Sequence, residues 1–143
     1  MLLDQKVGMM IWSPLSGGLL TGKYKRDGQK EEGRLSKFPY PPFHEERAYD
    51  VLDILVPMAK EKNVSVAQLA LGWLLHQPVV SSVIIGATKI KQLEDNLKST
   101  EVTFNAEELS RLNDVSKIPS EYPGGVLEVM TMDRSAGVDF LKA

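Results

Sequence analysis

The stretch WSPLSGGLLTGKY, residues 12–24, follows the short apolar run VGMMI and ends in a glycine-rich loop. A short apolar run that stops at a proline is typical of a strand buried on both faces of a parallel sheet. Gly17, four further residues and then Gly22-Lys23 come within one residue of the loop that binds nucleoside triphosphates. That loop requires Ser or Thr after the lysine and a helix starting there. This chain has Tyr24 and a helix-poor continuation, which argues against a triphosphate site.

The composition is that of an ordinary globular protein. Of 143 residues, 43% are hydrophobic and 25% are charged, which argues against a disordered or fibrous chain. The net charge of -2 provides no basic field, so neither nucleic acid nor an anionic membrane is an expected partner. The absence of cysteine removes disulfides, thiolate metal sites and cysteine nucleophiles, and it fits a reducing cytoplasm. No apolar stretch approaches the roughly 18 residues of a membrane span.

Helical patterns fill the middle of the chain. Residues 17–43 are rich in Gly, Pro and Lys without an apolar period, which predicts a long loop. Residues 45–62 repeat apolar side chains at spacings of three and four, which predicts a helix. Ser65 with Gln68 forms a capping box, which starts a nearly all-apolar and therefore buried helix that stops before Pro78.

A second strand and two further helices follow. Residues 81–86, SSVIIG, are short, apolar and β-branched, which predicts a second interior strand. Thr88 is expected to cap a helix that runs through Lys98, and Asn105 with Glu108 is expected to start a last helix that ends near residue 117. The apolar stripe of the first of these helices consists of Ile90, Leu93 and Leu97.

We therefore expect one partial domain with a parallel α/β architecture. Residues 1–43 hold the first strand and the glycine-rich loop, residues 44–117 hold the helices and the second strand, and residues 118–143 form an irregular tail. Two interior strands do not complete a parallel sheet, so the chain looks like part of a larger fold. Open strand edges template pairing, and we expect a homo-oligomer or a complex with the missing portion.

The ends of the two strands predict an anion site. The motifs WSPLSGG and GATK follow the strands, and ligands of α/β folds lie beyond the carboxyl ends of strands. A helix starting at Thr88 presents free N–H groups to an anion, and Lys89 adds a cation. Gln92 and Asn96 lie on the same helix face, where their amides can bond a purine edge. The sequence thus predicts a site for a mononucleotide.

The segments WSPLSGGLLTGKY, SVAQLALGWLL and VIIGATKIKQLEDNL resemble the final third of an aldo-keto reductase, in the microbial branch related to potassium-channel β-subunits. The resemblance extends from residue 2 to about residue 124. Members of this family are (β/α)8 TIM barrels that bind NADPH and reduce aldehydes or ketones. The resemblance implies that residues 7–12 form the seventh barrel strand and residues 82–85 the eighth. The chain would then be the C-terminal portion of such a barrel, incomplete and helix-rich, with a small-molecule carbonyl substrate.

The resemblance also implies a set of contacts to NADP(H). Trp12 corresponds to the aromatic residue that packs against the nicotinamide. The loop along the pyrophosphate is matched by Ser13, Pro14, Leu15 and Gly17, and cations that reach over the cofactor are matched by Lys23 and Arg34. The adenosine end is matched by Gly86, Thr88, Lys89, Gln92, Asp95 and Asn96. Of these, Thr88 and Lys89 would lie near the 2′-phosphate.

No catalytic residue is assigned to this chain. The family's Asp, Tyr, Lys and His come from the first four strands, to which nothing in this sequence corresponds. His76, at the end of a buried helix, is interpreted as structural, and His44, beside a proline-rich loop, as a helix-start residue in solvent. Three functions stay open. The chain is part of a truncated or split reductase that is inactive by itself, a nucleotide-binding or regulatory subunit without turnover, or a structural remnant that assembles with itself.

Overall fold

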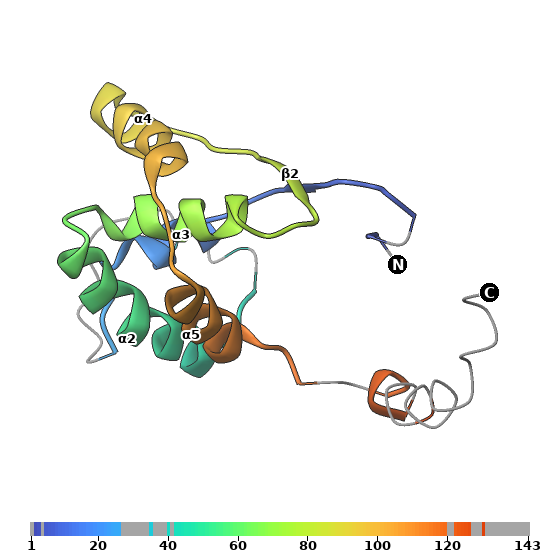
Figure 1. The fold of residues 1–143 in the computed structure, drawn as a ribbon. Coiled ribbons are helices and arrows are strands. Elements are labelled where there is room, and N and C mark those ends of the chain that lie inside the picture. Colours follow the sequence, from blue (N-terminus) through green and yellow to red (C-terminus); the bar gives the residue numbers. More distant parts are fainter. Residues whose placement is uncertain are drawn as a thin grey trace.

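The computed structural model describes residues 2–3, 5–26, 35, 40, 42–119, 122–126 and 130 (Figure 1). The elements in chain order are strand β1 (Met9–Ile11), 3-10 helix η1 (Ser16–Thr21), helices α2 (Glu45–Glu61) and α3 (Val66–Leu75), strand β2 (Val80–Val83), helix α4 (Ile90–Leu97), 3-10 helix η2 (Lys98–Glu101) and helix α5 (Ala106–Ser116). This is the predicted alternation of strands and helices, with shorter strands. The predicted tail, residues 118–143, lies mostly outside the described residues.

Helix α3 lies at the centre of the packing. Its residues Leu69, Ala70 and Leu71 are at most 2% exposed. The helix contacts α2, α4, β2 and both 3-10 helices. Figure 1 shows α4 on one side of α3, with α2 and α5 on the other. A helix that is apolar on more than one face needs neighbours on several sides, and this requirement gathers the other elements around α3.

The predicted helix starts at α3 and α5 are confirmed. At α3, the backbone N–H of Gln68 donates to Ser65 Oγ over 3.0 Å and the N–H of Ser65 donates to Gln68 Oε1 over 3.4 Å. Asn105 and Glu108 form the same reciprocal pair at α5. Each box satisfies two backbone donors that a helix start would otherwise leave unpaired.

Both histidines have structural roles, as predicted. His44 is the N-cap of α2, where its Nδ1 accepts from the backbone N–H of Arg47. His76 ends α3, with its Nδ1 2.8 Å from the carbonyl oxygen of Gly72. Its ring also packs edge-on against Phe104, with 4.9 Å between the ring centroids. Neither histidine belongs to the cavity described below.

The prediction of a loop throughout residues 17–43 is wrong at its start. Residues Ser16–Thr21 form η1, and Leu19 and Tyr24 are 2% and 4% exposed. They pack with Tyr49 and Leu52 of α2. Two isolated buried side chains produce no periodic apolar pattern that the sequence would reveal. Their packing nevertheless holds this segment against α2. Arg26 extends this attachment with hydrogen bonds to Asp50 and Asp53.

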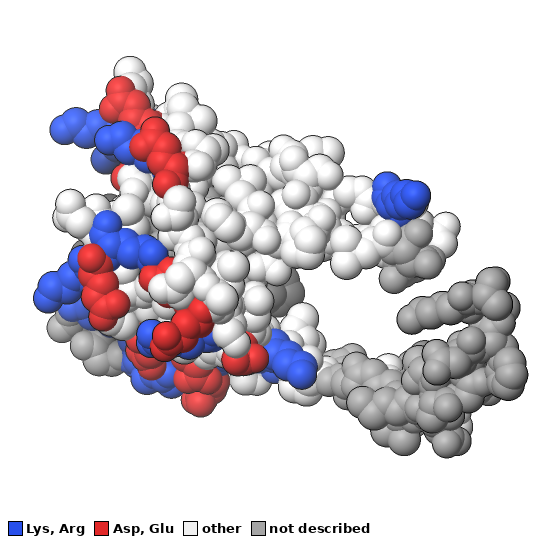
Figure 2. Space-filling model, viewed as in Figure 1, with Lys and Arg blue, Asp and Glu red and all other residues white. Residues whose placement is uncertain are grey.

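Strands β1 and β2 form a two-stranded parallel sheet. Ile11 pairs with Val83, and the backbone N–H of Ile84 donates to the carbonyl oxygen of Ile11 over 2.9 Å. The prediction that both faces are buried is wrong within the described residues, because Met9 and Met10 are 38% and 65% exposed. Figure 2 shows charged side chains gathered over the helices, whereas the surface over β2 is uncharged. This sheet therefore presents an uncharged, partly apolar surface.

Helix α4 begins later than predicted and faces outward with its apolar side. Lys89, not Thr88, is the N-cap, and it makes no side-chain capping bond. The apolar stripe is exposed, with Ile90 77%, Leu93 43% and Leu97 56% accessible to solvent. The polar residue Asn96 is 7% exposed instead. Helix α4 thus meets the rest of the structure through a polar side.

Among the described residues, no helix combines the length and apolar character that a membrane span requires.

Lys62 and Glu108 link α2 to α5 through a partly buried ion pair. Lys62 Nζ lies 2.7 Å from Glu108 Oε1, and the side chains are 23% and 19% exposed. Burial by itself would raise the pKa of Glu108. The hydrogen bond from Lys62 and the one from the Asn105 backbone N–H outweigh it, so the pKa is lowered from its ordinary value. A carboxylate with a lowered pKa in the folded state stabilises the fold above its unfolded pKa, and this stability is lost as the pH falls through the folded pKa.

We expect Glu108→Gln, which keeps the capping box, to lower the free energy of unfolding by about 1 kcal/mol at pH 7. The deficit should shrink progressively as the pH falls below the unfolded value of about 4.3 and through the lowered folded pKa, because the wild-type carboxylate then becomes protonated as well. Denaturant unfolding at pH 7 and about pH 3.5 measures this, with Glu107→Gln on the same helix as the control. A deficit that is equal at both pH values would contradict this role of the ion pair.

Candidate functional site

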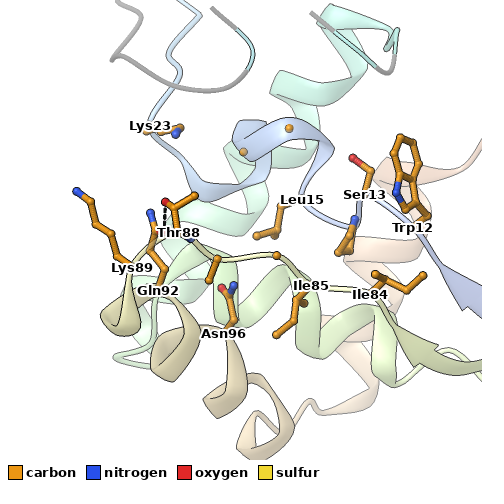
Figure 3. A pocket seen from close by; sticks show the side chains of 15 residues that line it. Trp12, Ser13, Leu15, Lys23, Ile84, Ile85, Thr88, Lys89, Gln92 and Asn96 are labelled. Carbon is orange, nitrogen blue, oxygen red and sulfur yellow. Dashed lines mark hydrogen bonds between the residues drawn. The ribbon is translucent and has the colours of Figure 1, made fainter. Parts of the chain in front are cut away.

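A cavity of about 950 Å³ lies at the carboxyl ends of the two strands. One wall is residues 12–15, 17 and 18 with Lys23, and the other is residues 84–89 with Gln92 and Asn96 of α4. Figure 3 shows Lys89 and Gln92 at one end of the cavity and Trp12 at the other, with Leu15 and Ile85 between them. An elongated cavity of this volume is large enough for a nucleotide-sized ligand.

The structure brings most of the predicted site residues to this cavity. The lining includes Trp12, Ser13, Pro14, Leu15, Gly17, Lys23, Gly86, Thr88, Lys89, Gln92 and Asn96. Asp95 is not among the lining residues, because its carboxylate is bonded to α3 instead. Arg34 lies outside the described residues. Sequence reasoning missed Gly18, Ile84, Ile85 and Ala87, although the last three follow the paired part of β2, where ligands of α/β folds lie.

The first wall turns sharply through a run of left-handed backbone conformations. The φ angles are 55° at Ser13, 48° at Ser16, 66° at Gly17 and 97° at Gly18. Glycine adopts such angles at little cost, whereas the two serines carry strain that the surrounding structure must offset. A Cβ atom at Gly17 would also lie 2.7 Å from Leu35 Cδ2. Strained turns of this kind are typical of ligand-binding loops.

Two lysines make the cavity electropositive. Lys23 extends over the glycine turn, since a Cβ atom at Gly18 would lie 3.3 Å from its Nζ. Lys89 lies at the far end, on the N-cap of α4. No Asp or Glu belongs to the described lining, so neither ammonium is neutralised there. The cavity therefore favours an anionic ligand, and a phosphate can meet cations at two points.

Side-chain amides line the cavity near Lys89. The backbone N–H and the hydroxyl of Thr88 both donate to Gln92 Oε1, each over 3.2 Å, which leaves the amide N–H₂ of Gln92 as a donor (Figure 3). Asn96 is 7% exposed, and its side chain makes no hydrogen bond to the part of the chain described. Its amide reaches the cavity, because it is not among the fully buried side-chain atoms that lack a partner in the described residues. A ligand with donors and acceptors, such as a nucleic base, would satisfy it.

An aromatic side chain occupies the opposite end. Trp12 is 56% exposed, and its ring centroid lies 6.2 Å from that of Tyr40 at an interplanar angle of 54°. Ile84 and Ile85 line the cavity on the side of β2. This end offers an aromatic face and aliphatic surface to a flat ring. No group of three or more potential metal ligands occurs among the described residues.

A comparison with family models identifies the family of the chain. The model of the Aldo/keto reductase family matches residues 1–117. The chain belongs to the aldo/keto reductase family. The resemblance stated from the sequence is thereby confirmed, including its branch, because relatives of the chain include proteins named as probable potassium-channel β-subunits.

Curated relatives are similar to most of this chain but are much longer. The chain is 36% identical to the L-glyceraldehyde 3-phosphate reductase of Escherichia coli O157:H7 in an alignment of 123 residues that covers 78% of this chain and 34% of that protein. It is 37% identical to a probable voltage-gated potassium channel subunit beta of Arabidopsis thaliana over 100 residues, 67% of this chain and 30% of that protein. The chain thus spans about a third of the length of these relatives.

We expect Asn96→Leu, a change of similar size, to leave the free energy of unfolding within about 0.5 kcal/mol of the wild-type value, because the amide has no hydrogen bond to the described residues that could be lost. The same change should weaken the binding of adenine nucleotides. Asn113→Leu is the control: Asn113 accepts from Trp73 Nε1 over 2.9 Å, so its loss should destabilise the chain. Denaturant unfolding and calorimetric titration measure both effects. A destabilised Asn96→Leu variant would contradict the interpretation of Asn96 as a ligand group.

Proposed function

We propose that the chain forms the NADP(H)-binding side of an aldo-keto reductase, with β1 and β2 as the seventh and eighth strands of a (β/α)8 barrel. Membership in the family supports the barrel, and the parallel pairing of the two strands agrees with it. The single observation that carries the proposal is the cavity. Its described lining combines two lysines, an amide-bearing end and an aromatic end in one elongated space, and it includes no carboxylate.

The residues present suit the parts of NADP(H) in order along the cavity. The adenine would lie against Gln92 and Asn96, whose amides can bond the edge of a purine. The 2′-phosphate would lie by Lys89 at the start of α4, where cation and helix dipole both favour an anion. The pyrophosphate would follow the strained turn of residues 13–18, beneath Lys23. The nicotinamide ring would stack on Trp12, which is exposed for such a contact.

Carbonyl reduction needs two further contributions at the Trp12 end. A bound NADPH supplies hydride to the carbonyl carbon. The carbonyl oxygen must receive a proton from a positioned acid as the hydride arrives. We propose that residues of the other barrel strands, in the same polypeptide or in a second chain, supply this acid and most of the substrate pocket. The substrate would be a small aldehyde or ketone, as the name of the Escherichia coli relative suggests.

A regulatory nucleotide-binding subunit is the second candidate. It is favoured by the lining itself, which among the described residues holds no Tyr, His, Asp or Glu that could serve as a general acid. It also fits the relatives named as probable potassium-channel β-subunits. Both candidates require the same nucleotide site, and they differ in whether carbonyl turnover appears when the remaining strands are present.

Two exposed apolar surfaces, one on the two-stranded sheet and one on the apolar stripe of α4, indicate where partners would bind. Met10 and Ile90, at 65% and 77% exposure, belong to apolar surfaces that β-sheet or helix neighbours would cover. We propose that these surfaces join the rest of the barrel, or a second copy of the chain where the rest is absent.

Lys89→Ala should weaken NADPH binding about tenfold or more while leaving NADH nearly unchanged, because a charge-assisted phosphate contact contributes about 1.5–3 kcal/mol. Calorimetric titration of the 143-residue chain with both cofactors measures this. Lys91→Ala is the matched control, since Lys91 lies on the same helix but outside the cavity lining. Equal losses for NADPH and NADH would contradict the placement of the 2′-phosphate at Lys89.

A further inference from the structure

We propose that Asp95 positions the nucleotide site instead of touching the nucleotide. The inference rests on the proposed function, because its consequence is a change in nucleotide binding. Asp95 Oδ2 accepts from Ser65 Oγ and Oδ1 accepts from Gln68 Nε2, each over 2.6 Å. Both carboxylate oxygens of Asp95 are thus hydrogen-bonded to residues at the start of α3. The carboxylate is therefore occupied by the structure itself and is absent from the cavity lining.

The two partners of Asp95 are also the capping box of α3. Ser65 Oγ accepts from the backbone N–H of Gln68 while it donates to Asp95. Gln68 Oε1 accepts from the backbone N–H of Ser65 while Nε2 donates to Asp95. Gln68 is 7% exposed, so these bonds are largely shielded from water. The side chains that cap α3 are thus the same ones that bind α4. Together they form one hydrogen-bond network, and its short charge-assisted bonds make it rigid.

Helix α4 depends on this network because apolar packing does not replace it. Its apolar stripe faces away from α3, as the exposure of Ile90 and Leu97 shows. The next fixed point along the chain is η2, where Gly72 of α3 allows a close approach: a Cβ atom there would lie 3.1 Å from the carbonyl oxygen of Ser99. Between these points, the Asp95 bonds set the orientation of α4.

The orientation of α4 decides where three ligand groups lie. Lys89 caps the helix, Gln92 precedes Asp95 by three residues and Asn96 follows it directly. All three line the cavity. A tilt or rotation of α4 would move the ammonium and both amides together. Loss of the Asp95 bonds should therefore weaken nucleotide binding whatever the base, whereas loss of a direct contact to the base would depend on its chemistry.

The test uses Gln68→Glu, which lies outside the cavity lining. Glutamate at this position keeps the capping box but replaces the donor to Asp95 with a second carboxylate.

Two probes are titrated into the 143-residue chain: 2′,5′-ADP and its inosine counterpart, which lacks the exocyclic amine. We expect Gln68→Glu to weaken both probes about tenfold. The double variant Gln68→Glu/Asp95→Asn should restore both to within about threefold, since the amide introduced by Asp95→Asn can donate to the new carboxylate. Glu94→Ala, which removes an exposed carboxylate of α4, should change neither.

Other results overturn the proposal. If Asp95 contacts the base, Gln68→Glu has little effect, and Asp95→Asn weakens 2′,5′-ADP alone with no rescue in the double variant. Hydrogen exchange of the free chain gives a second measurement: Gln68→Glu should speed exchange in residues 90–97 but not in α5, and the double variant should reverse this. Unchanged exchange in α4 overturns the role of Asp95. Wild-type chain that binds neither probe refutes the proposed function instead, and the exchange experiment then decides Asp95 by itself.

Discussion

The burial of α3 is the constraint on which the rest of the structure depends. Its sequence offers no continuous polar face, and Leu69 is fully buried. Covering it brings η1 to one side and α4 with η2 to another, while α2 closes the remaining side and β2 follows from its end. The cavity forms between η1 and α4 because both are held to this helix (Figure 1). The site is in this sense a consequence of how a nearly apolar helix is enclosed.

The two walls of the cavity are held by different forces. The wall at η1 is fixed by buried apolar side chains, with Leu19 and Tyr24 packed on α2. The wall at α4 is fixed by hydrogen bonds, because its apolar side faces solvent. Packing of apolar side chains is insensitive to small electrostatic changes. A charge-assisted hydrogen-bond network, in contrast, is weakened when a single donor is replaced. Nucleotide affinity should accordingly be tuned from the α4 side, while the turn of residues 13–18 sets the shape.

Much of this arrangement could be predicted from the sequence, and the failures have identifiable causes. Capping boxes are local, so Ser65 with Gln68 and Asn105 with Glu108 were readable without knowledge of the fold. The placement of Lys89, Gln92 and Asn96 in one cavity also follows from helical spacing. Strand burial could not be predicted, because it depends on neighbours that two strands do not provide. The start of α4 was missed because Thr88 bonds to Gln92 on the same helix, and the bonds of Asp95 to Ser65 and Gln68 join two separate helices, which no local pattern encodes.

We propose that adenine nucleotides bind between the turn of residues 13–18 and α4, and photolabelling of the chain tests this placement. The 143-residue chain is irradiated with 2-azidoadenine NADP⁺, and the labelled peptides are identified by mass spectrometry. We expect labelling within residues 86–97, where Gln92 and Asn96 line the cavity, and protection by excess NADP⁺. Labelling confined to α2 or α5, or labelling that excess NADP⁺ does not reduce, would contradict it.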